Sequence, residues 1–197
     1  MLLPLFPLPN LVLLPGLVVP LYVFEPRYRE LLAQVRESGE PFGIIRITRG
    51  AAEGAEPFLD RVTRWGSYAH VREVMEHEDG SASILVLGGE RFEVEAFNTS
   101  RSFLQAEVRD LPLAPSEPEV AAALARNLLA GVEAARPADA AQIHASAPAE
   151  PLLLASFAAV LLPITAEQRE EALMAASLVE RLERLLSWVP GESRTLN

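Results

Sequence analysis

Lysine and cysteine, two residue types that carry much of protein chemistry, do not occur in this sequence. Without cysteine there are no thiolate nucleophiles, thiolate metal ligands or disulfides. All 17 basic side chains are arginine, so no lysine can serve a phosphate-binding loop, a Schiff base or a Ser/Lys dyad. Arginine stays protonated and cannot replace lysine as a neutral base or amine nucleophile. ATPase chemistry of the phosphate-loop type and Ser/Lys proteolysis are therefore excluded for this stretch of chain.

The three histidines do not form a recognisable metal-binding pattern. No two of His70, His77 and His144 have the four-residue spacing that zinc peptidases use on a helix. His70 and His77 could share a sheet with the acidic stretch 76–79 and bind a metal, but charged side chains at a hairpin end are more often solvated. We predict no metal and no cofactor.

Hydrolysis by an activated serine or by a pair of carboxylates is not indicated by any motif in the sequence. The sequence has no Gly-x-Ser-x-Gly motif, and no spacing selects two of its 27 carboxylates as a catalytic pair. A small hydrolase remains an alternative class, and a deep pocket with a convergent titratable pair would indicate it. We predict no catalytic residues.

A polar and aromatic cluster at Glu25, Arg27, Tyr28 and Arg29 is the candidate partner-binding site. Arginine and tyrosine combine a large contact area with oriented hydrogen-bond donors, which suits ligand contact. The alternative is structural, with Arg27 tying a helix to the sheet and Tyr28 packing beneath it. We favour the structural alternative because Tyr28 already belongs to the apolar spacing of the helix.

The elements that must position this cluster are mostly short strands. Pro26 can open a helix whose apolar residues continue until Ser38 and Gly39, and 42–48 reads as a buried strand. We expect a loop at 50–57 and one or two strands over 62–78.

A hairpin and two further strands complete the β-rich part. Asp79 and Gly80 form the predicted hairpin turn before a return strand at 83–87. Gly88 and Gly89 predict a second reversal, with Gly89 at a positive φ. Strands at 92–96 and 104–108 follow.

The last third of the chain is helical. Ser116 and Glu119 resemble a capping box, and apolar residues then recur every four positions. A second helix is expected at 152–162 and a third after Pro163, capped by Thr165 and Gln168 and continuing into a leucine stripe that starts at residue 178. We predict about three helices. The domain prediction is a β-rich unit at 1–112 and a helical subdomain, packed on it, at 113–197.

Composition limits location and partners. The net charge of −10 divides evenly along the chain, with no basic arm, which disfavours nucleic acid and acidic membranes. The apolar stretch 1–24 has no preceding positive charge and five prolines, so we expect proline-joined strands and no signal peptide or membrane segment. The expected location is cytoplasmic.

Several segments resemble one known family. These are PLFPLPNLVLLPGLVVPLYVFEPRYRELL at 4–32, WGSYAHVREV at 65–74, DGSASILVLGGERFEV at 79–94 and LLLASFAAVLLPITAEQREEAL at 152–173. Together they resemble the N-terminal, substrate-binding domain of Lon proteases, and the segment 24–29 is most similar to its free-standing bacterial members. The resemblance implies an α+β fold: a PUA-like β pseudo-barrel with one interposed helix, followed by a C-terminal helical bundle.

What the resemblance implies about function is recognition. Lon uses this domain to help select protein substrates, so the expected activity is non-catalytic binding of unfolded or extended polypeptides, or of a partner protein. Either a groove between barrel and helices or a sheet edge could hold such a segment. The alternative is an RNA- or nucleotide-binding PUA-like protein, which a shared face of Arg46, Arg49, Arg61 and Arg64 would favour. We expect a monomer or weak dimer.

Overall fold

The structure is a computed structural model that describes residues 2–48 and 58–191. The chain divides into two compact units, Met1–Pro112 and Leu113–Asn197, which are described separately below. The loop expected at 50–57 and Arg49 lie outside the described residues.

Five strands of the first unit close into a ring. Around it, β5 pairs with β4, β4 with β3, β3 with β1, β1 with β6, and β6 with β5 again, while β2 pairs with β5 outside the ring. Only the β1–β3 pair is parallel. Closure leaves few unpaired strand edges, and it confirms the predicted α+β class and pseudo-barrel. The described strands are β1 (Leu2–Pro9), β2 (Val18–Val23), β3 (Phe42–Ile47), β4 (Val62–Glu76), β5 (Ala82–Asn98) and β6 (Gln105–Asp110).

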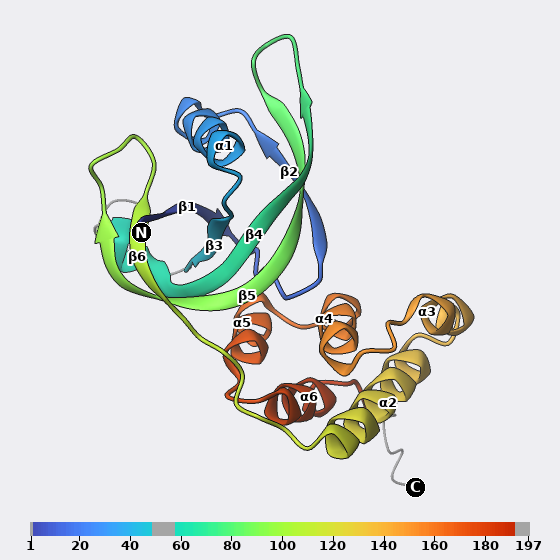
Figure 1. Ribbon diagram of the computed structural model, residues 1–197. Coiled ribbons are helices and arrows are strands. Elements are labelled where there is room, and N and C mark those ends of the chain that lie inside the picture. Colours follow the sequence, from blue (N-terminus) through green and yellow to red (C-terminus); the bar gives the residue numbers. More distant parts are fainter. Residues whose placement is uncertain (1, 49–57, 192–197) are drawn as a thin grey trace, which may run out of the picture. The chain divides into compact units, whose positions relative to one another are not determined.

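The interposed helix α1 (Pro26–Ser38) lies on the concave side of the curved β4–β5 ribbon (Figure 1). Proline occupies its first turn, where the missing N–H costs nothing, and Gly39 ends it with a left-handed φ of 71°. Both ends are as predicted. A short 3₁₀ helix, η1 (Phe58–Arg61), precedes β4.

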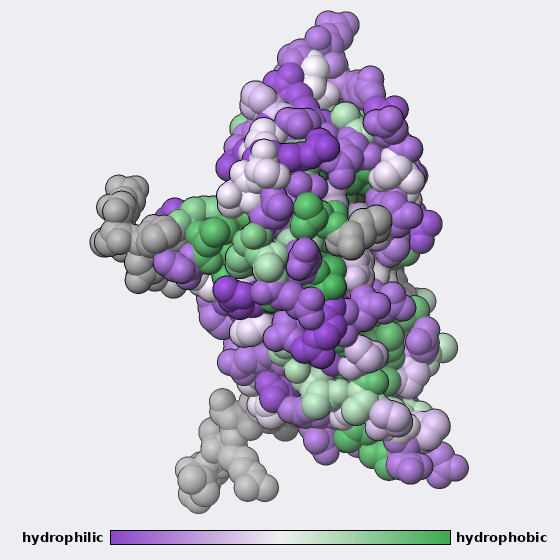
Figure 2. Space-filling view, turned by 60° about the vertical axis from the view of Figure 1, so that its left-hand side comes forward, coloured by the Kyte–Doolittle hydropathy of each residue, from purple (hydrophilic) through white to green (hydrophobic). Residues whose placement is uncertain are grey.

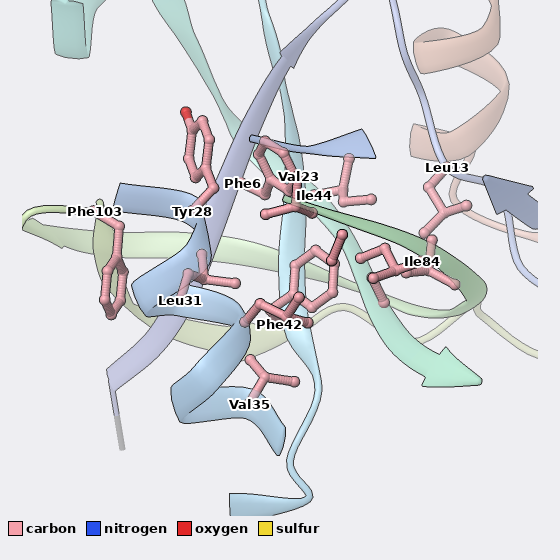
Figure 3. Close-up of a cluster of buried hydrophobic side chains, with 14 residues drawn as sticks. Phe6, Leu13, Val23, Tyr28, Leu31, Val35, Phe42, Ile44, Ile84 and Phe103 are labelled. Carbon is pink, nitrogen blue, oxygen red and sulfur yellow. The ribbon is translucent and has the colours of Figure 1, made fainter. Parts of the chain in front are cut away.

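One face of α1 supplies part of the barrel core. Leu31 and Val35 point from the helix toward Phe42, and Tyr28 lies beside Phe6 (Figure 3). Each such side chain contributes about 1.5–3 kcal/mol on full burial. This packing fixes the rotation of α1, and therefore the direction in which its first turn points.

The hairpin of β4 and β5 is longer than the sequence suggested. The Asp79–Gly80 turn is confirmed, with Gly80 at a φ of 78°. The second reversal predicted at Gly88 and Gly89 is wrong, because β5 runs unbroken from Ala82 to Asn98 and neither glycine has a positive φ.

Gly88 and Gly89 do not form a turn; they allow other parts of the chain to pack closely against β5. A Cβ on Gly88 would lie 2.2 Å from the carbonyl oxygen of Leu14, and one on Gly89 would lie 2.8 Å from Nε2 of His70. Glycine inside a strand often marks such a contact or a bulge. The β4–β5 register indeed shifts opposite this segment, between Ser67 and Ala69.

The second unit has five helices in its described part, against about three predicted. They are α2 (Pro118–Ala135), α3 (Ala140–Ser146), α4 (Pro151–Leu161), α5 (Ala166–Met174) and α6 (Leu178–Ser187). Among the described residues, none of these helices or α1 combines the length and apolar character needed to span a bilayer.

Two differences account for the helix count. The short α3 carries too few apolar positions to show a period. The predicted last helix is two helices, because α5 ends before Ala175 and Ser177 then caps α6 by accepting from the Glu180 N–H at 3.2 Å.

One predicted helix start is confirmed and one is wrong. The capping box of Thr165 and Gln168 is formed in both directions. Residue 117, and not Ser116, is the N-cap of α2. The Ser116 hydroxyl accepts from the Val179 N–H at 3.4 Å, so it serves the start of α6.

Candidate functional site

The four predicted residues lie where β2 ends and α1 begins. Glu25 has an extended backbone at the N-cap position, and Arg27, Tyr28 and Arg29 follow in the first turn. Successive helical residues point about 100° apart because a turn takes 3.6 residues. These three side chains therefore leave the helix in different directions and cannot all face one ligand.

Tyr28 belongs to both the core and the surface. The side chain is 6% exposed, and its ring centroid lies 4.1 Å from that of Phe6. Burial raises the pKa of the phenol above its ordinary value, while the Arg27 charge opposes this shift. The Arg27 guanidinium lies 4.6 Å from the ring centroid, and its Nη2 pairs with Glu25 Oε2 at 2.8 Å.

Arg29 points away from this group. Its Nε donates to the Phe24 carbonyl at 2.8 Å, and Nη1 reaches the Asp79 carbonyl at 3.5 Å. The guanidinium also lies against Gly80, where an added Cβ would be 2.8 Å from Nη1. Arg29 thus joins α1 to the β4–β5 turn.

Two neighbouring surface hollows lie beside Glu25, Arg27 and Tyr28. One has a volume of about 170 Å³ and the other about 240 Å³. They share Pro7, Arg27, Tyr28 and Phe58, so together they form one surface depression, called here the β1–α1 groove. Its ends are marked by Phe24 and by the segment 99–104.

Exposed aromatic side chains border the β1–α1 groove. Tyr22 is 54% and Phe24 55% exposed, and their stacked rings have centroids 5.8 Å apart. Phe58 is 37% exposed and lies beneath the Arg61 guanidinium at 5.9 Å. Figure 2 shows green, apolar residues gathered between purple, hydrophilic ones on one face of the protein. Contiguous apolar surface of this kind marks binding sites more often than chance.

Sequence reasoning missed the aromatic residues of the groove. Tyr22 and Phe24 stand two positions apart at the end of a strand, a spacing that places side chains on one face. That signal was available in the sequence. Phe58 gave no comparable signal, since it comes from a different part of the chain and meets the groove only through the fold.

The charges at the groove are paired. Arg101 Nη1 lies 3.7 Å from Glu30 Oε1, and Arg27 pairs with Glu25 as described above. Exposed pairs of this kind contribute little to stability, commonly below about 1 kcal/mol. Either arginine can therefore exchange its partner for a ligand acceptor at small cost.

The alternative sites are weaker. Among the described residues, no group of three or more histidine, aspartate or glutamate side chains is arranged to hold a metal ion. His77 contacts the Ser83 hydroxyl at 2.9 Å, and His144 lies 2.9 Å from Glu133 in the helical unit. His70 and His77 are seven strand residues apart, roughly 20 Å.

Of the described arginines that would form a nucleic-acid face, Arg46 is buried, Arg61 is half-buried and only Arg64 is exposed. Arg46 is only 7% exposed, and Arg64 lies over the Phe97 ring at 5.5 Å. Arg61 covers Phe58 at the groove. A phosphate backbone needs accessible cations, so this arrangement gives the alternative no support.

The closed β ring and its interposed helix define a β pseudo-barrel domain, with an apolar depression beside the helix. Residues 2–190 match the ATP-dependent protease La (LON) substrate-binding domain family. The chain belongs to this family, and the resemblance inferred from the sequence is confirmed.

Known proteins agree with the family assignment. The chain is 27% identical to the Lon protease of Rhizobium meliloti (strain 1021) over 98% of its own length and 24% of that protein. It is 28% identical to Lon protease 2 of Herpetosiphon aurantiacus over 93% and 23%, respectively. The chain thus spans about a quarter of these relatives.

Solved structures agree as well. The Lon N-terminal domain protein from Xanthomonas campestris superposes with a TM-score of 0.65 at 26% identity, covering 96% of this chain and 99% of that one. The N-terminal domain of the Mycobacterium avium complex Lon protease gives 0.69 at 22% identity, covering 96% and 98%, which supports the fold alone.

Proposed function

We propose that this chain is a non-catalytic recognition module that holds apolar, extended segments of other polypeptides in the β1–α1 groove. The observation that carries the proposal is the groove itself, with aromatic rings exposed around a depression that the core leaves open. Membership of a substrate-binding family supports it. That the substrates are polypeptides, and that a protease receives them, are both part of the proposal.

The groove has the chemistry for this occupant. Tyrosine, phenylalanine and arginine dominate the residues that contribute most to binding at protein interfaces. The exposed rings of Tyr22 and Phe24 offer apolar contact, and Arg27 offers donors for backbone carbonyls of a bound segment. Such a site selects apolar character more than a particular sequence.

The sheet edge is a poorer site. The outer strand β2 contains Pro20, paired with Leu85 of β5. Proline has no N–H to donate, and proline at an edge is a device that discourages strand addition. The groove is therefore preferred to strand addition at β2.

The absence of catalysis is proposed from residue content. The sequence contains no lysine and no cysteine, so neither a Ser/Lys dyad nor a thiolate nucleophile can form within it. The net charge of −10 supports polypeptide over nucleic acid as partner. We further propose a cytoplasmic location, which the cysteine-free composition supports, and a monomer or weak dimer, testable by sedimentation at several concentrations.

Binding of a permanently unfolded protein tests the proposal. Reduced, carboxymethylated α-lactalbumin with a fluorescent label should raise its anisotropy when this protein is added. Phe24→Ser should weaken binding about tenfold, since loss of an aromatic anchor commonly costs more than about 1 kcal/mol. Phe24 is exposed, so the substitution should leave the fold intact.

Met75→Ser is the matched control. Met75 is 66% exposed on the same unit but lines neither hollow. The Met75→Ser variant should bind the unfolded protein as tightly as the unchanged chain does. Equal weakening by both substitutions, or no binding of any unfolded chain, would refute the groove as the site.

A further inference from the structure

A second depression in the barrel unit is larger than the groove and differs from it in chemistry. It has a volume of about 490 Å³, within the usual range of ligand sites, and shares no lining residue with the β1–α1 groove. It is lined by residues from the start of β1, the end of α1 and the strands β4, β5 and β6. We call this depression the acidic cavity.

Three carboxylates line the acidic cavity, from Glu40, Glu90 and Asp110. Of the lining residues only His70 is basic; none is arginine, and the sequence has no lysine. The apolar part of the wall includes Leu3 and Val108. The cavity thus combines an excess of negative charge with apolar surface.

Hydrogen-bond acceptors in the cavity outnumber donors. The Tyr68 hydroxyl donates to Asp110 Oδ1 at 2.7 Å, which uses its only proton. Gln34, a half-buried residue, also lines the cavity, and its Oε1 is buried with no donor among the described residues.

The electrostatics of Tyr68 show that the carboxylates act on the cavity. The pKa of its phenol is raised, first by burial, then by the hydrogen bond to Asp110 and by the charges of Asp110 and Glu90. Burial opposes any charge, whereas the charges of Asp110 and Glu90 oppose a phenolate and favour a cation.

We infer that the acidic cavity binds an aliphatic cation: the guanidinium or ammonium group of an arginine or lysine side chain on a bound polypeptide, or of a polyamine that shares this chemistry. An arginine side chain supplies five N–H donors and an ammonium three, while an aliphatic stem packs on apolar surface. The peptide form of the inference rests on the proposed function. The module then recognises basic side chains at one site and apolar segments at another.

Paired peptides test the inference on the full chain. The probe is a fluorescent Gly-Leu-Arg-Leu-Gly peptide, and its counterpart carries citrulline, which has nearly the shape of arginine but no charge. The arginine peptide should bind about tenfold more tightly, because hydrogen bonds to charged groups are the strong ones. Added salt should weaken its binding. Equal binding of the two peptides, or no binding of either, overturns the inference.

A charge-matched pair of variants locates the site. Glu90→Gln removes an exposed cavity carboxylate and should weaken the arginine peptide about tenfold. Glu107→Gln removes an exposed carboxylate on β6 that does not line the cavity, and should change nothing. No effect of Glu90→Gln overturns the inference.

Two further arms separate the possible outcomes. Displacement of the peptide by spermidine would show that a free polyamine also fits, whereas no displacement would assign the site to side chains of polypeptides. The Phe24→Ser measurement is independent of both. If the two peptides bind equally but Phe24→Ser still weakens binding of the unfolded protein, only the inference about the cavity is refuted. If the arginine peptide binds more tightly but Phe24→Ser has no effect, only the proposed function of the groove is refuted.

Discussion

At the residue scale, Tyr28 shows why a surface site and the core cannot be separated by sequence alone. Its ring packs 4.1 Å from Phe6, and the same side chain lines both hollows of the β1–α1 groove. The structural interpretation of the motif therefore holds for this residue, and ligand contact at the same residue is part of the proposed function. A substitution of Tyr28 would change stability and binding together, which is why Phe24 is the better probe.

Gly88 gives a prediction at this scale. A Cβ there would lie 2.2 Å from the Leu14 carbonyl oxygen, and backbone hydrogen bonds to Gly16 and Leu17 hold Gly88 against this loop. Gly88→Ala should lower the free energy of unfolding by about 3 kcal/mol, at the upper end of the usual overpacking cost. Urea unfolding measures it.

Gly191→Ala is the comparison for Gly88→Ala, since nothing lies within 4 Å of its added Cβ. It should unfold with the midpoint of the unchanged protein. If Gly88→Ala were equally stable, the close approach of residues 14 and 88 would be wrong.

At the element scale, the junction of α5 and α6 is held by a buried arginine. Arg181 is 1% exposed; its Nε donates to the Ala172 carbonyl at 2.9 Å and its Nη2 to the Leu173 carbonyl at 3.0 Å. A cation at the carboxyl end of α5 also opposes the negative end of that helix dipole. One side chain of α6 thus caps α5, which explains how a pattern that looks like one helix divides in two.

Arg181→Met should destabilise the helical unit by about 3 kcal/mol, because charge-assisted hydrogen bonds are lost and buried carbonyls lose their donor. Thermal unfolding followed by circular dichroism measures the loss. The control is Arg184→Met on the same helix, where a half-exposed guanidinium pairs with Glu180 at 2.6 Å. That change should cost only about 0.5 kcal/mol. Similar losses in both variants would contradict the capping role of Arg181.

At the scale of the whole molecule, the sequence predicts what neighbouring residues determine and misses what distant ones bring together. The helix that begins at Pro26 and the turn at Gly80 follow from local chemistry, and both were predicted with their ends. The glycines of β5 were misinterpreted because their partners lie far away in the sequence. The predicted cluster supplies Glu25, Arg27 and Tyr28 of the groove, but the exposed aromatic residues were missed, and Phe58 comes from a distant segment.

Each unit also has apolar residues sufficient for a core of its own. The two buried clusters around the barrel draw every member from the first 112 residues, which supports the proposal that residues 1–112 form a domain. An isolated fragment of residues 1–112 should therefore unfold cooperatively, as small single domains do. A broad, non-cooperative transition of this fragment would contradict the proposal.

The position of the cut should matter because of Arg91. Its side chain is buried, and its Nε donates to the Leu111 carbonyl at 2.7 Å while Nη2 donates to the Pro112 carbonyl at 3.3 Å. A fragment of residues 1–110 removes these two acceptors of a buried guanidinium, at a cost of about 2–3 kcal/mol. It should melt well below the fragment of residues 1–112, although it lacks only two residues. Equal melting temperatures would show that solvent replaces these carbonyls, and the boundary would then have no structural meaning at Pro112.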